Sequence, residues 1–228
     1  MRYTTLLFDL DHTLFDSEAS AAAAFDDTLR SEGVADPSHY YRAFEEINVV
    51  LWAKVETGEL TPNDVRHLRF RQLIDATDLD SNAVRMGDRY VRGLGSNGDL
   101  YPGAREAIDT LAGVASLALI TNGIGEVQRS RIERLTIDHY FDAIAISGEV
   151  GHAKPGTRIF DIVFEELGNP AKDSALIVGD NLGSDIQGGV NYGIDTCWYN
   201  PERQVSSGVP VTHTITDLAA IRPIASSG

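Results

Sequence analysis

The sequence contains little cysteine, little lysine and no long hydrophobic run. These shortages argue against a disulfide-bonded protein, a nucleic-acid-binding protein and a membrane protein, respectively. Its one cysteine, Cys197, has no second thiol with which to form an internal disulfide, which is typical of a reducing compartment. No segment approaches the roughly 18 uninterrupted apolar residues of a transmembrane helix. The first residues also lack the pattern of a signal peptide. We therefore expect a soluble, cytoplasmic protein with no membrane partner.

Positive charge is scarce as well. The chain has 19 Lys and Arg residues against 34 Asp and Glu residues, and its formal net charge is −15 at pH 7. So acidic a chain is not expected to bind nucleic acid, because that requires a basic surface. If the protein acts on an anionic substrate, the positive field must come from a metal ion and a few placed cations.

What the chain does have is a helical pattern between residues 16 and 98, with no convincing strand. The 228 residues, of which 43% are hydrophobic, suffice for one sizeable core and a small second domain. Apolar residues recur at helical spacing in this segment, and Thr61-Pro62 has the residue types of a helix start. We expect helices over 17–30, over 37–55, from Pro62 onward and over 81–91, with Gly93–Gly98 as a hinge.

Short apolar segments alternate with helical ones outside that segment. The expected strands are a first one beginning near Tyr3 and others over 116–120, 143–147, 175–178 and 196–199, and the expected helices cover 104–111, 126–135, 157–167, 184–192 and 217–221. Nearly continuous apolar strands that alternate with helices predict an α/β fold, a doubly wound parallel sheet with helices on both faces. The predicted organisation is a discontinuous Rossmann-like core of residues 1–15 and 99–228 with an inserted all-helical cap domain of residues 16–98.

The first strand is followed by two carboxylates and a hydroxyl. Asp9 and Asp11 are two positions apart, so both can leave the same side of the strand and converge beyond its end, and Thr13 follows them. Two carboxylates so close together repel each other unless a cation lies between them. Oxygen ligands suit Mg²⁺, although a strand followed by an ordinary polar turn would show the same residue types.

Three later strands end in residues that suit the same chemistry. Thr121, followed by Asn122, offers a hydroxyl and backbone N–H groups for phosphate oxygens. Lys154 lies in the loop after the third strand, and Asp180 and Asp185 follow the fourth. Any one of these residues could be structural, but four carboxylates at one edge of a sheet would repel one another without a cation. The combination predicts a Mg²⁺ site with a nucleophile, a hydroxyl and a lysine.

Taken in order, these residues resemble the motifs of the haloacid dehalogenase (HAD) superfamily of phosphotransferases. The matching elements are Asp9-x-Asp11-x-Thr13, Thr121, Lys154-Pro155 and Gly179-Asp180-x₄-Asp185. A helical insert between the first two motifs is typical of subfamily I, in which it forms a cap over the active site. More closely, the chain is similar to the bacterial pyrimidine 5′-nucleotidases of that subfamily. That similarity includes the insert residues Asn48, Leu51, Trp52, Gly58, Arg69 and Phe70 and the segments Ile120–Gly123, Ile146–Pro155 and Asp195–Trp198.

The resemblance implies a mechanism and a substrate class. Asp9 would be the nucleophile that forms an aspartyl-phosphate, and Asp11 the general acid and then the general base. The groups implied to bind the phosphoryl group are Thr121, Asn122 and Lys154, and those implied to hold Mg²⁺ are Asp9, Asp11 through its backbone carbonyl, Asp180 and Asp185. The implied function is hydrolysis of a small phosphate monoester, above all a nucleoside 5′-monophosphate, by a monomer or a homodimer.

Other functions are compatible with part of this pattern. A sugar-phosphate phosphatase or a phosphohexomutase keeps the same motifs, whereas a dehalogenase of the superfamily is expected to lack Asp11. A non-catalytic phospho-acceptor or binding module can also group Asp, Thr and Lys around Mg²⁺, but receiver domains are shorter and have no helical insert. Four aromatic residues of the insert could stack on a nucleotide base or could form the core of the insert. They are Trp52, Tyr40, Tyr41 and Phe44.

Overall fold

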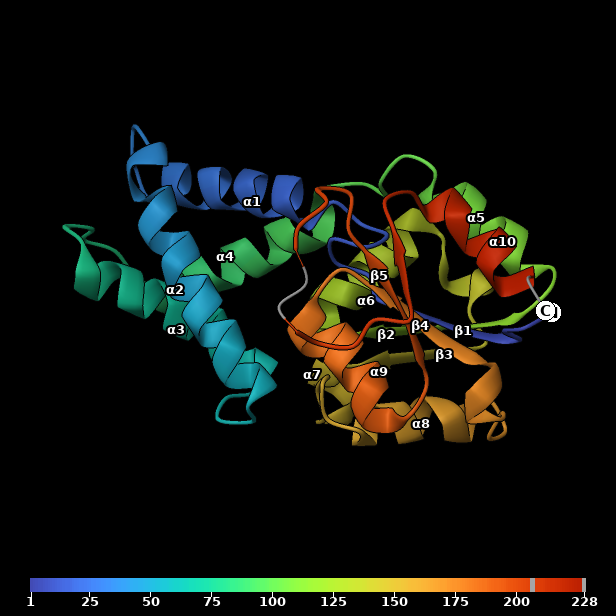
Figure 1. Cartoon of the computed structure of the whole chain (residues 1–228). Helices are drawn as coiled ribbons and strands as arrows, with labels where there is room; N and C mark the ends of the chain where they lie inside the picture. The colour runs from blue at the N-terminus through green and yellow to red at the C-terminus, as the bar shows by residue number, and fades with distance from the viewer. Residues whose placement is uncertain (206–207, 227–228) are drawn as a thin grey trace.

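The computed structural model describes residues 1–205 and 208–226 and has a six-stranded parallel sheet at its centre (Figure 1). The strands are β1 (Thr5–Phe8), β2 (Ser116–Thr121), β3 (Ala143–Ile146), β4 (Ala175–Gly179), β5 (Asp195–Tyr199) and β6 (His213–Ile215). Their spatial order is β3-β2-β1-β4-β5-β6, and every neighbouring pair is parallel. The order changes direction between β1 and β4, the position at which sheets of this kind bind ligands beyond the carboxyl ends of the strands.

Both faces of the sheet are buried. Leu6 and Phe8 of β1 belong to one hydrophobic cluster, which α5 (Ala104–Ala112) and α10 (Ile221–Ser226) cover. Leu7 lies in a second cluster, which α8 (Arg158–Glu166) and α9 (Gln187–Tyr192) cover on the opposite side (Figure 1). Because successive residues of the central strands are buried on opposite faces, these strands are apolar without polar alternation. The predicted α/β class is confirmed.

Shorter elements complete this part of the chain. They are α6 (Gly125–Leu135), α7 (Ser147–Val150), the 3₁₀-helices η1 (Asp138–Tyr140), η2 (Lys172–Ser174) and η4 (Leu218–Ala220), and the π-helical turn η3 (Leu182–Ile186). The helix expected over 184–192 is therefore divided into η3 and α9, and the one expected over 217–221 into η4 and α10. Strand β6 was not predicted from the sequence.

Residues 16–98, which we call the helical insert, contain four helices and, in this fully described segment, no strand. The helices are α1 (Ser17–Ser31), α2 (Ser38–Glu56), α3 (Pro62–Ala76) and α4 (Ala83–Ser96), and they lie to one side of the sheet (Figure 1). The predicted start of α3 is confirmed: the Thr61 hydroxyl accepts from the Asp64 N–H at 3.3 Å, and the Asp64 carboxylate accepts from the Thr61 N–H at 2.8 Å. Among the described residues, no helix is both long and apolar enough to cross a membrane.

The predicted hinge at Gly93–Gly98 is wrong for Gly93 and Gly95, which lie inside α4. A Cβ atom on Gly93 would be 2.8 Å from the Cβ of Ala24 in α1, and one on Gly95 would be 2.8 Å from the Ser130 hydroxyl in α6. These glycines therefore allow α4 to pack closely against helices on both sides. Of the three glycines in this segment, Gly98 alone, with a φ of +84°, needs the conformational freedom expected of a turn glycine.

Candidate active site

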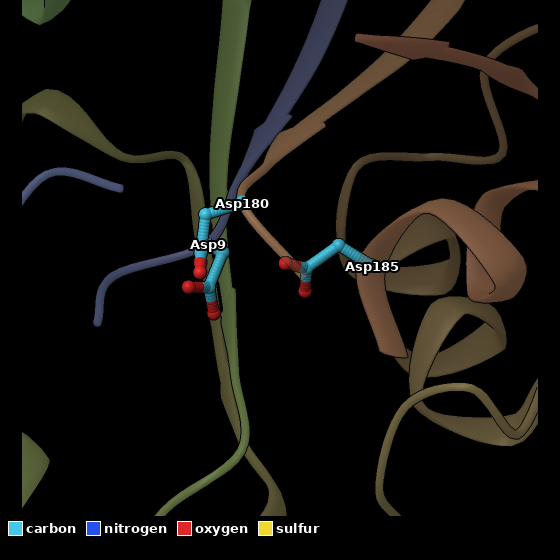
Figure 2. Close-up of side chains that lie close together, drawn as sticks. All are labelled: Asp9, Asp180 and Asp185. Carbon is cyan, nitrogen blue, oxygen red and sulfur yellow. The ribbon is translucent and has the colours of Figure 1, made fainter. Parts of the chain in front are cut away.

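Three carboxylates meet beyond the carboxyl ends of the two central strands. Asp9 follows β1, Asp180 follows β4, and Asp185 lies in the π-helical turn η3. One oxygen atom of each lies within 4.8 Å of the others. Figure 2 shows Asp9 and Asp180 side by side, with the carboxylate of Asp185 directed toward them from the neighbouring turn. The sheet thus brings together residues that are up to 176 positions apart in the chain.

The Lys154 ammonium group joins two of these carboxylates. Its Nζ donates to Asp9 Oδ1 and to Asp185 Oδ1, both at 2.6 Å, and to the carbonyl of Ile120 at 2.7 Å. Although burial opposes its charge, the Asp185 and Asp9 carboxylates raise the pKa of Lys154, so the side chain stays protonated. One buried cation faces three carboxylates, and a negative excess remains.

Burial and the neighbouring carboxylates both favour protonation of Asp9 and Asp180. Burial raises the pKa of Asp9 well above its ordinary value in spite of the attraction of Lys154, and the other carboxylates add to the rise. Burial also raises the pKa of Asp180 to about 7, with Asp185 as the next cause. A site of oxygen donors in which carboxylates tend to take up protons fits a hard divalent cation. The residues present are therefore compatible with a metal ion.

The Asp11 side chain lies apart from this cluster. Its Oδ2 accepts from Gln128 Nε2 and its Oδ1 from Arg131 Nη1, both at 2.6 Å, and both donors are on α6. Any contribution of Asp11 to the metal site is therefore left to its backbone carbonyl, which remains a prediction. Gln128 Nε2 also donates to Thr121 Oγ1 at 2.9 Å, so one amide fixes the spacing between Asp11 and Thr121.

Asn122 lines the same cavity as Asp9 and Lys154, and its phosphate contact remains a prediction. Its side chain pairs with the backbone of Lys154 in both directions: Nδ2 donates to the Lys154 carbonyl and Oδ1 accepts from the Lys154 N–H, each at 2.9 Å. Because both ends of the amide are engaged, the side chain positions the loop that carries the lysine. Thr121 is completely buried at the end of β2, and its phosphate contact remains a prediction.

A cavity of about 430 Å³ connects these groups with the helical insert. Asp9 and Lys154 line it from the sheet, and the aromatic residues that line it from the insert are Tyr41, Phe44, Trp52 and Tyr90. Tyr40 is not among the lining residues, and its hydroxyl donates to Asp78 at 3.0 Å. Trp52 is half-buried and packs beside the small cluster of Leu51, Val55 and Val65, so it serves the core of the insert and also faces the cavity.

The sequence places this fold in a known family. Residues 6–199 match the model of the haloacid dehalogenase-like hydrolases. The chain belongs to that family. As a haloacid dehalogenase-like hydrolase it is an enzyme, as predicted from the motifs.

Individual members of this family are similar over nearly the whole chain. The pyrimidine 5′-nucleotidase YjjG of Escherichia coli is 32% identical over 221 residues, 96% of each chain. The pyrimidine 5′-nucleotidase PynA of Streptococcus pneumoniae is 34% identical over 202 residues, 88% of this chain and 85% of the relative. The solved structure of the HAD-hydrolase YfnB of Bacillus subtilis, bound to magnesium, matches with a TM-score of 0.90 and 30% identity over 99% of this chain and 100% of that one. The predicted resemblance is confirmed.

Two residues of this hydrolase were missed at the sequence level, namely Gln128 and Arg131. Both are almost completely buried on α6, where they hold the Asp11 carboxylate. The sequence does contain a signal for them, because they share the face of the helix on which Val127, Ile132 and Leu135 are buried. Polar residues on the apolar face of a helix have a partner inside the protein.

Proposed function

We propose that this haloacid dehalogenase-like hydrolase is a Mg²⁺-dependent phosphatase that cleaves pyrimidine nucleoside 5′-monophosphates through an aspartyl-phosphate. The observation that carries the proposal is Lys154, which is buried between Asp9 and Asp185 beside a third carboxylate. Phosphoryl transfer requires positioning and neutralisation of three phosphate oxygens, and such a site offers both. The names of the relatives YjjG and PynA support the substrate class.

Asp9 and Asp11 carry out the first half-reaction. A carboxylate oxygen of Asp9 forms a bond to phosphorus, the bond from phosphorus to the ester oxygen breaks, and a proton from Asp11 goes to the leaving alcohol. In the second half-reaction Asp11 takes a proton from a water molecule, which attacks phosphorus and releases Asp9 and inorganic phosphate. Thr121 and Lys154 hold the phosphoryl oxygens in both steps.

The metal ion would be held by Asp9, Asp180, Asp185 and the backbone carbonyl of Asp11. When bound, it neutralises charge on the phosphoryl group. The protein orients the ligands: the Thr13 hydroxyl donates to Asp180 Oδ1 at 3.2 Å, and the Asn181 N–H donates to Asp185 Oδ2 at 3.0 Å. Both acids therefore have partners within the protein that orient them, and the ion would bind to a site that is already arranged.

The helical insert is proposed as the cap, with residues 1–15 and 99–228 as the catalytic core. Every phosphate ester presents the same phosphoryl group to the core, so substrate choice must come from the insert side of the cavity. A sugar-phosphate phosphatase is the second candidate, since the N-acylneuraminate-9-phosphatase of Rattus norvegicus is 28% identical over 221 residues. The aromatic lining favours a planar base over a sugar.

A panel of phosphate esters with purified protein and Mg²⁺ tests this function. We expect steady release of inorganic phosphate from UMP and dTMP, with kcat/KM at least about tenfold higher than for ribose 5-phosphate or hexose phosphates. The absence of turnover on every ester would contradict a phosphatase. Conversion of a hexose 1-phosphate to its 6-phosphate would instead identify a phosphohexomutase.

A further inference from the structure

Two buried polar atoms of the helical insert have no hydrogen-bond partner among the described residues. They are Arg69 Nη2 on α3 and Asn48 Oδ1 on α2, and no other buried side-chain nitrogen or oxygen of the described residues is left unpaired in this way. Both residues line the cavity that leads to Asp9 and Lys154. One atom is a donor and the other an acceptor.

The surroundings of Arg69 compensate for its burial only in part, since Tyr90 and Val65 are its partners and Nη2 has none. Its side chain is 2% exposed, Nε donates to the carbonyl of Val65 at 3.0 Å, and Cζ lies 5.1 Å from the centre of the Tyr90 ring. Among the ion pairs of the described residues, none includes Arg69. A buried cation without a counter-charge or a full set of acceptors is costly, and so is a buried acceptor without a donor. A ligand in the cavity would relieve both costs.

The cavity restricts what that ligand can be. Tyr41, Phe44 and Trp52 supply flat apolar surface, which suits a planar ring. Glu45 and Glu56 also line the cavity, so a leaving group with its own carboxylate would meet negative charge. The ring therefore needs a neutral acceptor for Arg69 and a donor for Asn48.

We propose that Arg69 and Asn48 form the subsite for the leaving group, and that they recognise a pyrimidine base in which a carbonyl oxygen lies beside an N–H. Uracil and thymine have this arrangement: Arg69 Nη2 donates to a ring carbonyl, and Asn48 Oδ1 accepts from the imide N–H. The subsite discriminates between substrates and takes no part in the bond changes at phosphorus. This inference rests on the proposed phosphatase activity of the same cavity.

Steady-state kinetics of Arg69→Met and Asn48→Leu test the proposal. We expect kcat/KM for UMP to fall about 10- to 100-fold in each variant, and that for ribose 5-phosphate, which has no base, to change less than about threefold. Arg71→Met is the matched control, because Arg71 is an exposed arginine of the same helix and does not line the cavity. Equal losses on UMP and ribose 5-phosphate would mean that the two residues only stabilise the insert, and would overturn the proposal.

A modified substrate gives a second measurement that folding defects do not mimic. 3-Methyl-UMP lacks the imide N–H, so the wild-type protein should prefer UMP over it about 10- to 100-fold. Asn48→Leu should lose most of that preference, while Arg71→Met should keep it. An unchanged preference in Asn48→Leu, or a higher kcat/KM for phosphoserine than for UMP in the wild type, would overturn the assignment.

Calorimetry with uridine separates this proposal from the proposed function, since the nucleoside has no phosphate. Binding by the wild type that Arg69→Met weakens about tenfold or more would support the subsite even if no ester were hydrolysed. Hydrolysis of UMP without any effect of the two variants on uridine binding or on substrate preference would leave the phosphatase standing and overturn the subsite.

Discussion

Arg131 Nη1 donates to Asp11 Oδ1 at 2.6 Å, although the two residues are 120 positions apart in the chain. The same guanidinium donates through Nε to the carbonyl of Leu94 in α4 at 3.0 Å. Its Cζ lies 4.5 Å from the centre of the Phe15 ring. One buried side chain therefore links the proposed acid–base group directly to the helical insert.

Arg131→Met should lower kcat for UMP by about 100-fold, because Asp11 loses one of the two donors that orient it. The loss should be much smaller for p-nitrophenyl phosphate, whose leaving group needs no proton. Arg134→Met is the control: Arg134 is on the same helix and donates to the carbonyls of Gly95 and Gly98, without touching Asp11. Equal losses on both substrates, together with a melting temperature lower than that of Arg134→Met, would show that Arg131 acts only through stability.

Asp9→Asn is expected to abolish turnover, with a loss of more than about 10⁴-fold in kcat, since an amide is not an adequate nucleophile. Circular dichroism should be unchanged, because Lys154 keeps its bond to Asp185. Retention of a tenth of the wild-type rate would make the assignment of Asp9 as the nucleophile wrong.

Chelation by EDTA should remove activity, and excess Mg²⁺ should restore it. Since the ion binds only the folded site, the melting temperature should rise by roughly 5–10 °C at a Mg²⁺ concentration of about 100 times Kd. Asp180→Asn should abolish this rise. Full activity in excess chelator would disprove the metal requirement.

Trp52→Ala should lower kcat/KM for a pyrimidine nucleotide by about 5- to 150-fold if the base stacks on the indole ring. Hydrolysis of p-nitrophenyl phosphate should fall much less. Trp52 also packs beside Leu51, so the melting temperature of the variant should be measured with its kinetics. Losses of equal size on both substrates would show that Trp52 merely holds the insert together.

Glu32→Gln should make stability less dependent on pH below about 4.5. Arg85 on α4 donates to Glu32 Oε1 at 2.8 Å and Ser81 donates to Oε2 at 2.6 Å, and these bonds lower the pKa of Glu32 from 4.5 to about 2. The stabilisation is complete above pH 4.5, where the carboxylate is charged in both states, and is lost as pH falls toward 2. Urea titrations at pH 7, 4 and 3 should show the wild-type advantage shrinking; an advantage that is constant over this range would contradict the assignment.

The central strands and the acids that follow them could be predicted because each leaves a local pattern. Every residue of β1 is buried, Leu6, Leu7 and Phe8 form a continuous apolar run, and Asp9 follows it directly. Strand β6 has three residues, of which only Ile215 is buried, and so short an edge strand has no distinct pattern. The contacts that turn Asp11 toward α6 depend on residues far away in the chain, and no local pattern contains them.

The end of α4 could not be predicted for a related reason. Glycine usually marks the end of a helix, and the sequence does not show which helix will press against it. Glycine is required at positions 93 and 95 because Ala24 and Ser130 pack directly against them, and these two residues are tens of positions away in the chain. Close packing of this kind is visible only once the neighbouring helices are known.

The contact of α4 with α6 sets a limit for protein engineering. The hydrophobic cluster of the helical insert includes Val127 of α6 and Ile124, which immediately precedes that helix, and Arg131 donates to the carbonyl of Leu94 in α4. A chimera that exchanged residues 16–98 alone for those of another family member would leave α6 facing a foreign surface. Grafts meant to transfer substrate preference should therefore carry α6 together with the insert, even though nearly thirty residues separate α4 from α6.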